Sequence, residues 1–171
     1  MGLTVDRSVE DAFILTLFDL VNHLTKNGER IVQPEGLTVQ QWLLMLQIAG
    51  DPNFPWPDGG DGPVVLASSI ASARGVSRPS VSSLVSSLVH KGLLAQDEDP
   101  TDRRHKTLRV TEAGLDVLRR IEPRRRRAND TLLAGFEQDE LARALDVLNR
   151  CLTVLRALRP SADGSDDRRI A

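Results

Sequence analysis

The sequence has few of the residues from which catalytic, metal and disulfide sites are built. It contains one cysteine and three histidines. A single cysteine excludes a disulfide framework within the chain and fits a reducing compartment. The histidines lie far apart without metal-ligand spacing, and no catalytic motif is present. We therefore expect no enzyme, no metal site and no cofactor.

Long hydrophobic runs are also missing. No apolar run approaches the roughly 20 residues of a membrane-spanning helix, and the first residues lack the charged start and apolar middle of a signal peptide. We expect a cytoplasmic protein without a membrane partner. Its 171 residues suffice for one sizeable domain, or for a small domain with helical arms.

Positive charge does not exceed negative charge overall, but it is locally concentrated. The formal net charge is −2, yet residues 74–127 carry thirteen Lys and Arg against seven Asp and Glu, which leaves −8 for the remainder. A local surplus of positive charge is what a nucleic-acid contact surface requires.

Two helical patterns with a tight turn between them occupy the middle of the chain. Ala67–Arg74 favours a helix that ends at Gly75, because glycine tolerates the positive φ of a helix end. Val76 follows and is expected to be a buried plug. Ser77 can cap a second helix, and Pro79 fits its first turn.

The second helix has one apolar and one polar face. Apolar residues recur at spacings of three and four: Val81, Leu84, Val85, Leu88 and Val89. The exposed serines lower helix propensity, so a partner surface explains them better than helix stability does. Serine can donate to phosphate oxygens or base edges, and a solvated face is the alternative. The candidate DNA contacts here are Ser77, Arg78, Pro79, Ser80, Ser82, Ser83, Ser86 and Ser87.

A hairpin pattern comes next. Leu93 and Leu94 begin a short strand, and residues 106–110 alternate between polar and apolar side chains. An arginine held by an aspartate on the intervening loop suits insertion into a narrow minor groove, whereas the alternative is a surface ion pair. The candidate residues are Asp102, Arg103, Arg104 and Lys106.

Two stretches carry a family resemblance. The run 99–104 (DPTDRR), with Leu108, Val110, Thr111 and Gly114 after it, resembles the wing signature of the MarR family of bacterial transcriptional regulators. Residues 76–94, which end in the sequence KGLL, are similar to that family's recognition helix and exit turn. With the flanking helices, the resemblance covers residues 8–158. It implies that the helix from Ser77 enters the major groove and that Arg103 or Arg104 enters the minor groove. Many members carry arginine where this chain has Ser83 or Ser87, so the family's sequence preference cannot be transferred.

The two ends of the chain carry helical patterns that are apolar on more than one side. These are residues 8–26 and residues 138–158, and the second repeats leucine at coiled-coil spacing. A helix with two apolar sides needs two partners, and in a small protein the second is often another subunit. We expect these helices to form a dimer interface, which is also the MarR arrangement.

The remaining segments connect these parts. Thr38 and Gln41 predict a capping box that opens a helix, and residues 51–63 predict a surface loop. Thr111 caps a further helix that Pro123 must kink or interrupt. The arginines of that helix either contact the backbone of a duplex, form a solvated basic face or pair with acidic helices: Arg119, Arg120, Arg124, Arg125, Arg126 and Arg127.

These patterns predict a mainly α fold with a small β-hairpin wing. We expect a dimerisation helix and loop at 8–36, a winged helix-turn-helix domain at 37–118, C-terminal dimerisation helices at 119–160 and a disordered tail at 161–171. The resemblance implies a sequence-specific repressor that binds double-stranded DNA at a palindromic operator as a homodimer.

The resemblance also implies control by a small molecule, for which an aromatic or phenolic carboxylate is the expected class. Candidate ligand contacts are His23, Trp42 and Met45, and ordinary packing is the favoured alternative for His23 and Trp42. Two other functions stay open: a winged protein-interaction module without DNA binding, and a redox sensor that uses Cys151. An inert buried thiol is favoured at Cys151 because it lies in an apolar helical pattern.

Overall fold

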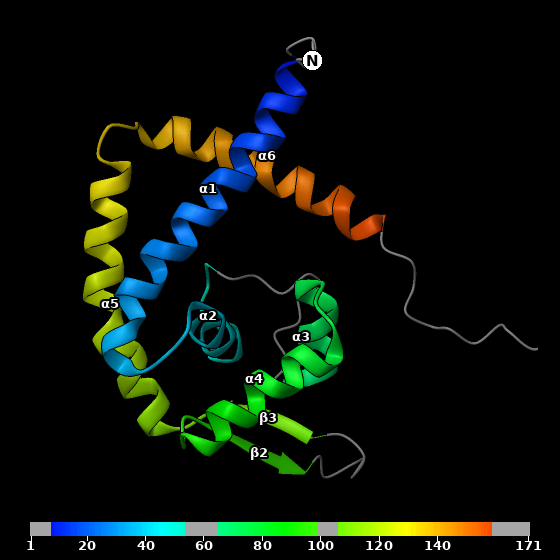
Figure 1. Ribbon diagram of the computed structural model, residues 1–171, viewed down its shortest axis with the longest axis vertical. Coiled ribbons are helices and arrows are strands. Elements are labelled where there is room, and N and C mark those ends of the chain that lie inside the picture. Colours follow the sequence, from blue (N-terminus) through cyan, green and yellow to red (C-terminus); the bar gives the residue numbers. More distant parts are fainter. Residues whose placement is uncertain (1–7, 54–64, 99–105, 159–171) are drawn as a thin grey trace, which may run out of the picture. The chain divides into compact units, whose positions relative to one another are not determined.

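The computed structural model describes residues 8–53, 65–98 and 106–158. Figure 1 shows a mainly helical chain with a small antiparallel sheet, which confirms the predicted fold class. The elements are α1 (Val9–Val32), the 3₁₀ helix η1 (Gln33–Glu35), α2 (Val39–Ile48), β1 (Val65–Leu66), α3 (Ala67–Arg74), α4 (Arg78–His90), β2 (Leu94–Glu98), β3 (Lys106–Val110), α5 (Glu112–Leu133) and α6 (Gln138–Ala157).

The chain divides into two compact units, Met1–Ala128 and Asn129–Ala171. The first unit holds the elements from α1 to β3 and most of α5, and the second holds α6. Within the described ranges, no helix combines the length and the apolar character that crossing a bilayer requires.

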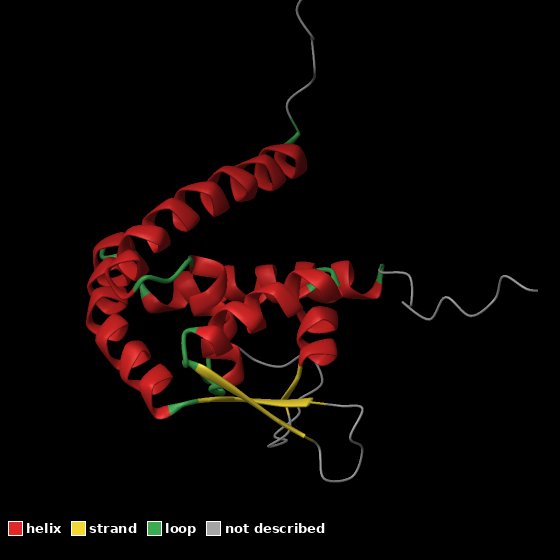
Figure 2. Ribbon diagram, turned by 60° about the horizontal axis from the view of Figure 1, so that its bottom comes forward, coloured by secondary structure: helices red, strands yellow, loops and turns green. Residues whose placement is uncertain are grey.

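The sheet has one strand more than the sequence predicted. Figure 2 draws the strands in yellow. Their order is β1-β3-β2, and both pairings are antiparallel. In the hairpin Leu94 pairs with Val110 and Glu98 pairs with Lys106, whereas β1 places Val65 opposite Leu108. Strand β1 was missed because two residues are too short to show an alternating pattern.

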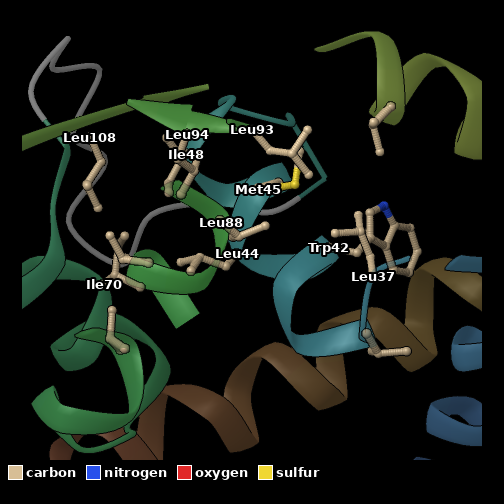
Figure 3. Close-up of a cluster of buried hydrophobic side chains, with 14 of the residues drawn as sticks. Leu37, Trp42, Leu44, Met45, Ile48, Ile70, Leu88, Leu93, Leu94 and Leu108 are labelled. Carbon is tan, nitrogen blue, oxygen red and sulfur yellow. The ribbon is translucent and has the colours of Figure 1, made fainter. Parts of the chain in front are cut away.

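The hydrophobic core of the first unit lies between α2, α3, α4 and the sheet. Figure 3 shows Leu44 and Met45 of α2, Ile70 of α3 and Leu88 of α4 gathered in this region, and all four are fully buried. Leu88 belongs to the predicted apolar stripe of α4, of which Val81 and Val85 are also buried while Leu84 and Val89 are partly buried. Burying side chains of this size contributes about 1.5–3 kcal/mol each, so the stripe fixes which face of α4 looks outward.

The caps around α4 form as predicted. Gly75 ends α3 with a φ of 65°, and the Ser77 hydroxyl accepts from the Ser80 amide at 3.3 Å. Val76 was expected to be buried, but 42% of it is exposed. Its amide donates to the Ala71 carbonyl at 3.2 Å, so backbone hydrogen bonds close the turn and no buried side chain is needed there.

Two helices run further than the sequence suggested. Helix α1 continues to Val32 and passes into η1, where a loop was expected. Helix α5 is not interrupted at Pro123. Proline removes one hydrogen bond from a helix interior, and the burial of Ile121 one half-turn earlier helps to offset that loss.

The first residues of α5 lie against the residues that lead into β2. Thr111 donates its hydroxyl to the Gly92 carbonyl at 2.7 Å and accepts from the Gly114 amide at 3.1 Å, as a cap should. A Cβ on Gly114 would lie 2.3 Å from the Leu93 carbonyl oxygen and 2.6 Å from Val110 Cγ1. The helix can therefore approach the strand only because position 114 has no side chain.

Gly114→Ala should lower the free energy of unfolding by about 1–2 kcal/mol. Alanine favours a helix over glycine by about 1 kcal/mol, but overpacking against a backbone carbonyl costs more. Denaturant unfolding measures the change. Gly135→Ala is the matched control because a Cβ there meets nothing within 4 Å. A Gly114→Ala protein as stable as this control would contradict the described approach.

Candidate nucleic-acid interface

Helix α4 has a polar face that points away from the core. The side chains of Arg78, Pro79, Ser80, Ser82, Ser83 and Ser86 are exposed. At the start of the helix, the Ser77 and Ser80 hydroxyls are 2.7 Å apart and hydrogen-bonded to one another. The predicted candidates from Ser77 to Ser86 therefore share one accessible surface of small, hydroxyl-rich side chains.

Ser87 differs from the other serines of α4. It is half-buried, and its hydroxyl accepts from Gln41 Nε2 of α2 at 2.9 Å. The structure therefore turns this predicted contact residue partly towards the body of the protein. No local signal predicts this bond, because the partner lies 46 residues earlier in the chain.

The wing carries a side-chain pair that sequence reasoning missed. Arg109 Nε of β3 donates to Asp97 Oδ2 of β2 at 2.7 Å, and both side chains are exposed. An exposed pair of this kind contributes roughly 0–1 kcal/mol and helps to keep the two strands in register. Lys106 begins β3, whereas the predicted Asp102, Arg103 and Arg104 lie outside the described residues.

The arginines of α5 are engaged inside the chain. Glu35 of η1 accepts from Arg120 at 2.9 Å and from Arg124 at 2.6 Å, and Asp51 accepts from Arg125 at 3.2 Å. Hydrogen bonds from Arg124 and Arg120 hold the pKa of Glu35 below its ordinary value. These contacts favour the third of the predicted roles, pairing with acidic residues.

The other arginines of this helix also have partners nearby. Arg119 pairs with Asp116, and Arg126 lies 2.7 Å from Glu122, which also pairs with Arg125. Arg127 Nε donates to the Pro123 carbonyl at 3.3 Å. The positive run of α5 is thus largely paired within the chain, whereas Arg78 at the start of α4 is an exposed cation outside this run.

Comparisons with known proteins agree with this geometry. Residues 35–105 match the family model described as MarR family. The transcriptional activatory protein BadR of Rhodopseudomonas palustris is 28% identical over 149 residues, covering 86% of this chain and 81% of BadR. The chain belongs to the MarR family.

Two solved structures of other proteins share the fold. The PcaV regulator of Streptomyces coelicolor, in complex with its natural ligand, has a TM-score of 0.70 and 25% identity, covering 91% of this chain and 99% of PcaV. MepR of Staphylococcus aureus, solved as a DNA complex, has a TM-score of 0.66 and 19% identity, covering 87% and 99%. As a MarR-family protein, the chain is a DNA-binding transcriptional regulator and not an enzyme.

The predicted ligand residues of this MarR-family protein lie in different environments. Met45 is fully buried and Trp42 nearly so, and both belong to the core drawn in Figure 3. His23 is exposed on α1, where its Nε2 lies 3.7 Å from Asp19 Oδ1. Core packing thus accounts for Trp42 and Met45, and His23 is not part of that core.

Cys151 lies on α6, where it is free and partly exposed in the single chain. Large apolar side chains of the same helix are exposed there as well, so the burial expected for Cys151 at a dimer interface stays a prediction. Within the described residues, no three His, Cys, Asp or Glu side chains gather closely enough to hold a metal ion.

Acid should weaken the first unit through Glu35. Its folded-state pKa is depressed, so its contribution to stability is present above the unfolded value of about 4.5 and is lost as pH falls through the lower folded value. Glu35→Gln should flatten the fall in unfolding free energy below pH 4.5. Urea unfolding between neutral and acidic pH measures this. The exposed first-turn carboxylate Glu10 provides a control, Glu10→Gln; an equal flattening in both variants would contradict the assignment.

Proposed function

We propose that this MarR-family protein is a homodimeric repressor that reads a palindromic operator with the exposed face of α4. The observation that carries the proposal is the polar face of α4, whose opposite face is buried on the core. Small serine side chains let the backbone approach base edges closely, and their hydroxyls can donate to bases or phosphates. Two copies of α4 related by a two-fold axis would contact half-sites about one helical turn apart.

The proposed dimer rests on apolar side chains that one chain leaves in water. On α1, Phe18 is 68% exposed and Val21 is 57% exposed. On α6, Leu145 and Leu155 are each 58% exposed. Large exposed apolar patches mark interaction sites in soluble proteins. A second copy of the same chain is the proposed partner, since a two-fold interface matches like surfaces.

The proposed phosphate contacts come from few residues. The arginines of α5 are paired within the chain, so the proposed cationic contacts are Arg78 of α4 and the wing residues Arg103, Arg104 and Lys106. Asp102 is proposed to hold one wing arginine for the minor groove. Binding should weaken with salt at a log-log slope of about −0.9 per phosphate neutralised.

Arg104→Ala should weaken binding to the operator by about tenfold or more and reduce the salt slope by about 1, because one cation is lost from the interface. The assay is a titration at two salt concentrations against a duplex selected from random sequences by the wild-type protein. Arg119→Ala is the matched control, since that guanidinium is already paired with Asp116. Salt-independent binding, or equal losses in the two variants, would contradict the proposal.

We further propose that a small molecule releases the protein from DNA. The complex of PcaV with its natural ligand supports an effector site, and the family resemblance suggests an aromatic or phenolic carboxylate. His23, Trp42 and Met45 are the proposed contacts. Because Trp42 and Met45 are already packed, a ligand that reaches them must rearrange the core around α2. It can shift the DNA-binding equilibrium only by its different affinity for the two states.

A panel of aromatic carboxylates should contain compounds that lower operator affinity, as measured by DNA titration with and without each compound. His23→Ala should reduce the response without changing DNA affinity in the compound's absence. The sign of regulation needs a reporter gene behind the selected operator, because BadR is described as an activatory protein. Higher reporter expression in the presence of the regulator would overturn the repressor assignment.

A further inference from the structure

A buried carboxamide joins the inner side of α4 to the corner between η1 and α2. Gln41 is only 6% exposed. Its Nε2 donates to Ser87 Oγ of α4 at 2.9 Å, and its Oε1 accepts from the Thr38 amide at 3.1 Å and from Lys91 Nζ at 3.2 Å. One side chain therefore connects the first turn of α2 with the last turns of α4.

Lys91 forms a second link to the same corner. It caps the C-terminus of α4, and its Nζ donates to the Gly36 carbonyl at 2.6 Å as well as to Gln41. Gly36 has a φ of 67°, a conformation that favours glycine, and this backbone turn sets where its carbonyl points. The Lys91 ammonium is thus directed at two acceptors of the protein itself.

The corner that receives these bonds is held from two other helices. Glu29 of α1 accepts from the Val39 amide at 3.0 Å, and Glu35 accepts from Arg120 and Arg124 of α5. The Glu35 side chain is 12% exposed, so both of its ion pairs are partly shielded from solvent. Gln41 and Lys91 therefore attach α4 to a segment that is itself fixed.

We propose that Gln41 and Lys91 are positioning residues for DNA recognition, which fix the second half of α4 against this corner. The inference rests on the proposed role of α4 in the major groove. Apolar burial is non-directional, so Val85 and Leu88 fix which face of α4 lies on the core but constrain its axial position and the fine setting of its rotation less closely. Hydrogen bonds are directional and supply that constraint. Short serine side chains make the constraint matter, since they cannot extend to compensate for a displaced helix.

A direct role for Lys91 at a phosphate predicts a different result. Loss of a phosphate contact weakens binding to all sequences and lowers the salt slope by about 1, whereas loss of positioning weakens binding to the operator and leaves the slope unchanged. Gln41 is uncharged and buried, so its replacement cannot remove a phosphate contact. If replacing Gln41 and replacing Lys91 change DNA binding in the same way, the effect of Lys91 comes from positioning α4 and not from a phosphate contact.

The test uses Gln41→Met, Lys91→Met and the double variant in the full-length protein. Affinity is measured for the selected operator and for a scrambled duplex at two salt concentrations. Each single change should weaken operator binding by about tenfold, because each removes hydrogen bonds that restrain α4. Binding to the scrambled duplex and the salt slope should stay at wild-type values. The double variant should bind the operator only slightly more weakly than either single variant, because the two residues are hydrogen-bonded to one another and hold α4 against the same corner.

Gln33→Met is the matched control, since it makes the same change in an exposed side chain of the same corner. Lys91→Met leaves the Thr38–Gln41 capping box in place, so its agreement with Gln41→Met excludes loss of that cap as the cause. Equal losses for operator and scrambled duplex, a reduced salt slope in Lys91→Met, or operator affinity equal to that of Gln33→Met would each overturn the proposal.

Hydrogen exchange in the free protein gives a readout that does not depend on DNA. Amides from residue 84 to residue 92 should exchange faster in Gln41→Met and Lys91→Met than in Gln33→Met. A wild-type protein without operator preference would refute the proposed function. The exchange data would then still decide whether these residues hold α4, and unchanged exchange in both variants would overturn that claim.

Discussion

The burial of one face of α4 is the constraint on which the proposed recognition surface depends. Val81, Val85 and Leu88 are buried on one side of the helix, so the hydroxyl-rich side faces solvent. Gly75 ends α3, and the N-cap at Ser77 sets where α4 begins. The polar bonds of Gln41 and Lys91 then restrain its far end. Apolar packing determines which face of α4 is exposed, and the directional hydrogen bonds restrain how the helix is oriented on the core.

Charge in this protein serves two separate purposes. On α5, arginines pair with Glu35, Asp51 and Glu122, and all three carboxylates have a lowered pKa. The pairs of Glu35 and Asp51 tie η1 and the turn after α2 to α5. A net charge of −2 is therefore compatible with DNA binding, because a small number of cations on α4 and the wing can act locally.

Sequence reasoning succeeded where a feature depends on neighbouring residues. The Ser77 cap, the Gly75 helix end and the Thr38–Gln41 capping box each involve positions within a few residues, and all three formed as predicted. The apolar stripe of α4 followed from helical periodicity. Strand β1 was too short to show any period.

Sequence reasoning failed where the partner is distant in the chain. Ser87 is hydrogen-bonded to Gln41, 46 residues away in the sequence, and Arg120 to Glu35, 85 residues away. No local pattern could show that this serine is partly turned inward or that this arginine is paired within the chain. Val76 was misjudged for a related reason, because turn closure by backbone bonds is independent of side-chain type. The site was thus predictable as a surface but not in the hydrogen bonds that support it.

Two copies of α4 are proposed to read one duplex around a two-fold axis. Hydroxyl-radical footprinting of the full-length protein on its selected operator tests this arrangement. We expect two protected patches, related by symmetry and about one helical turn apart. A single protected patch, or protection that does not follow the palindrome, would contradict it.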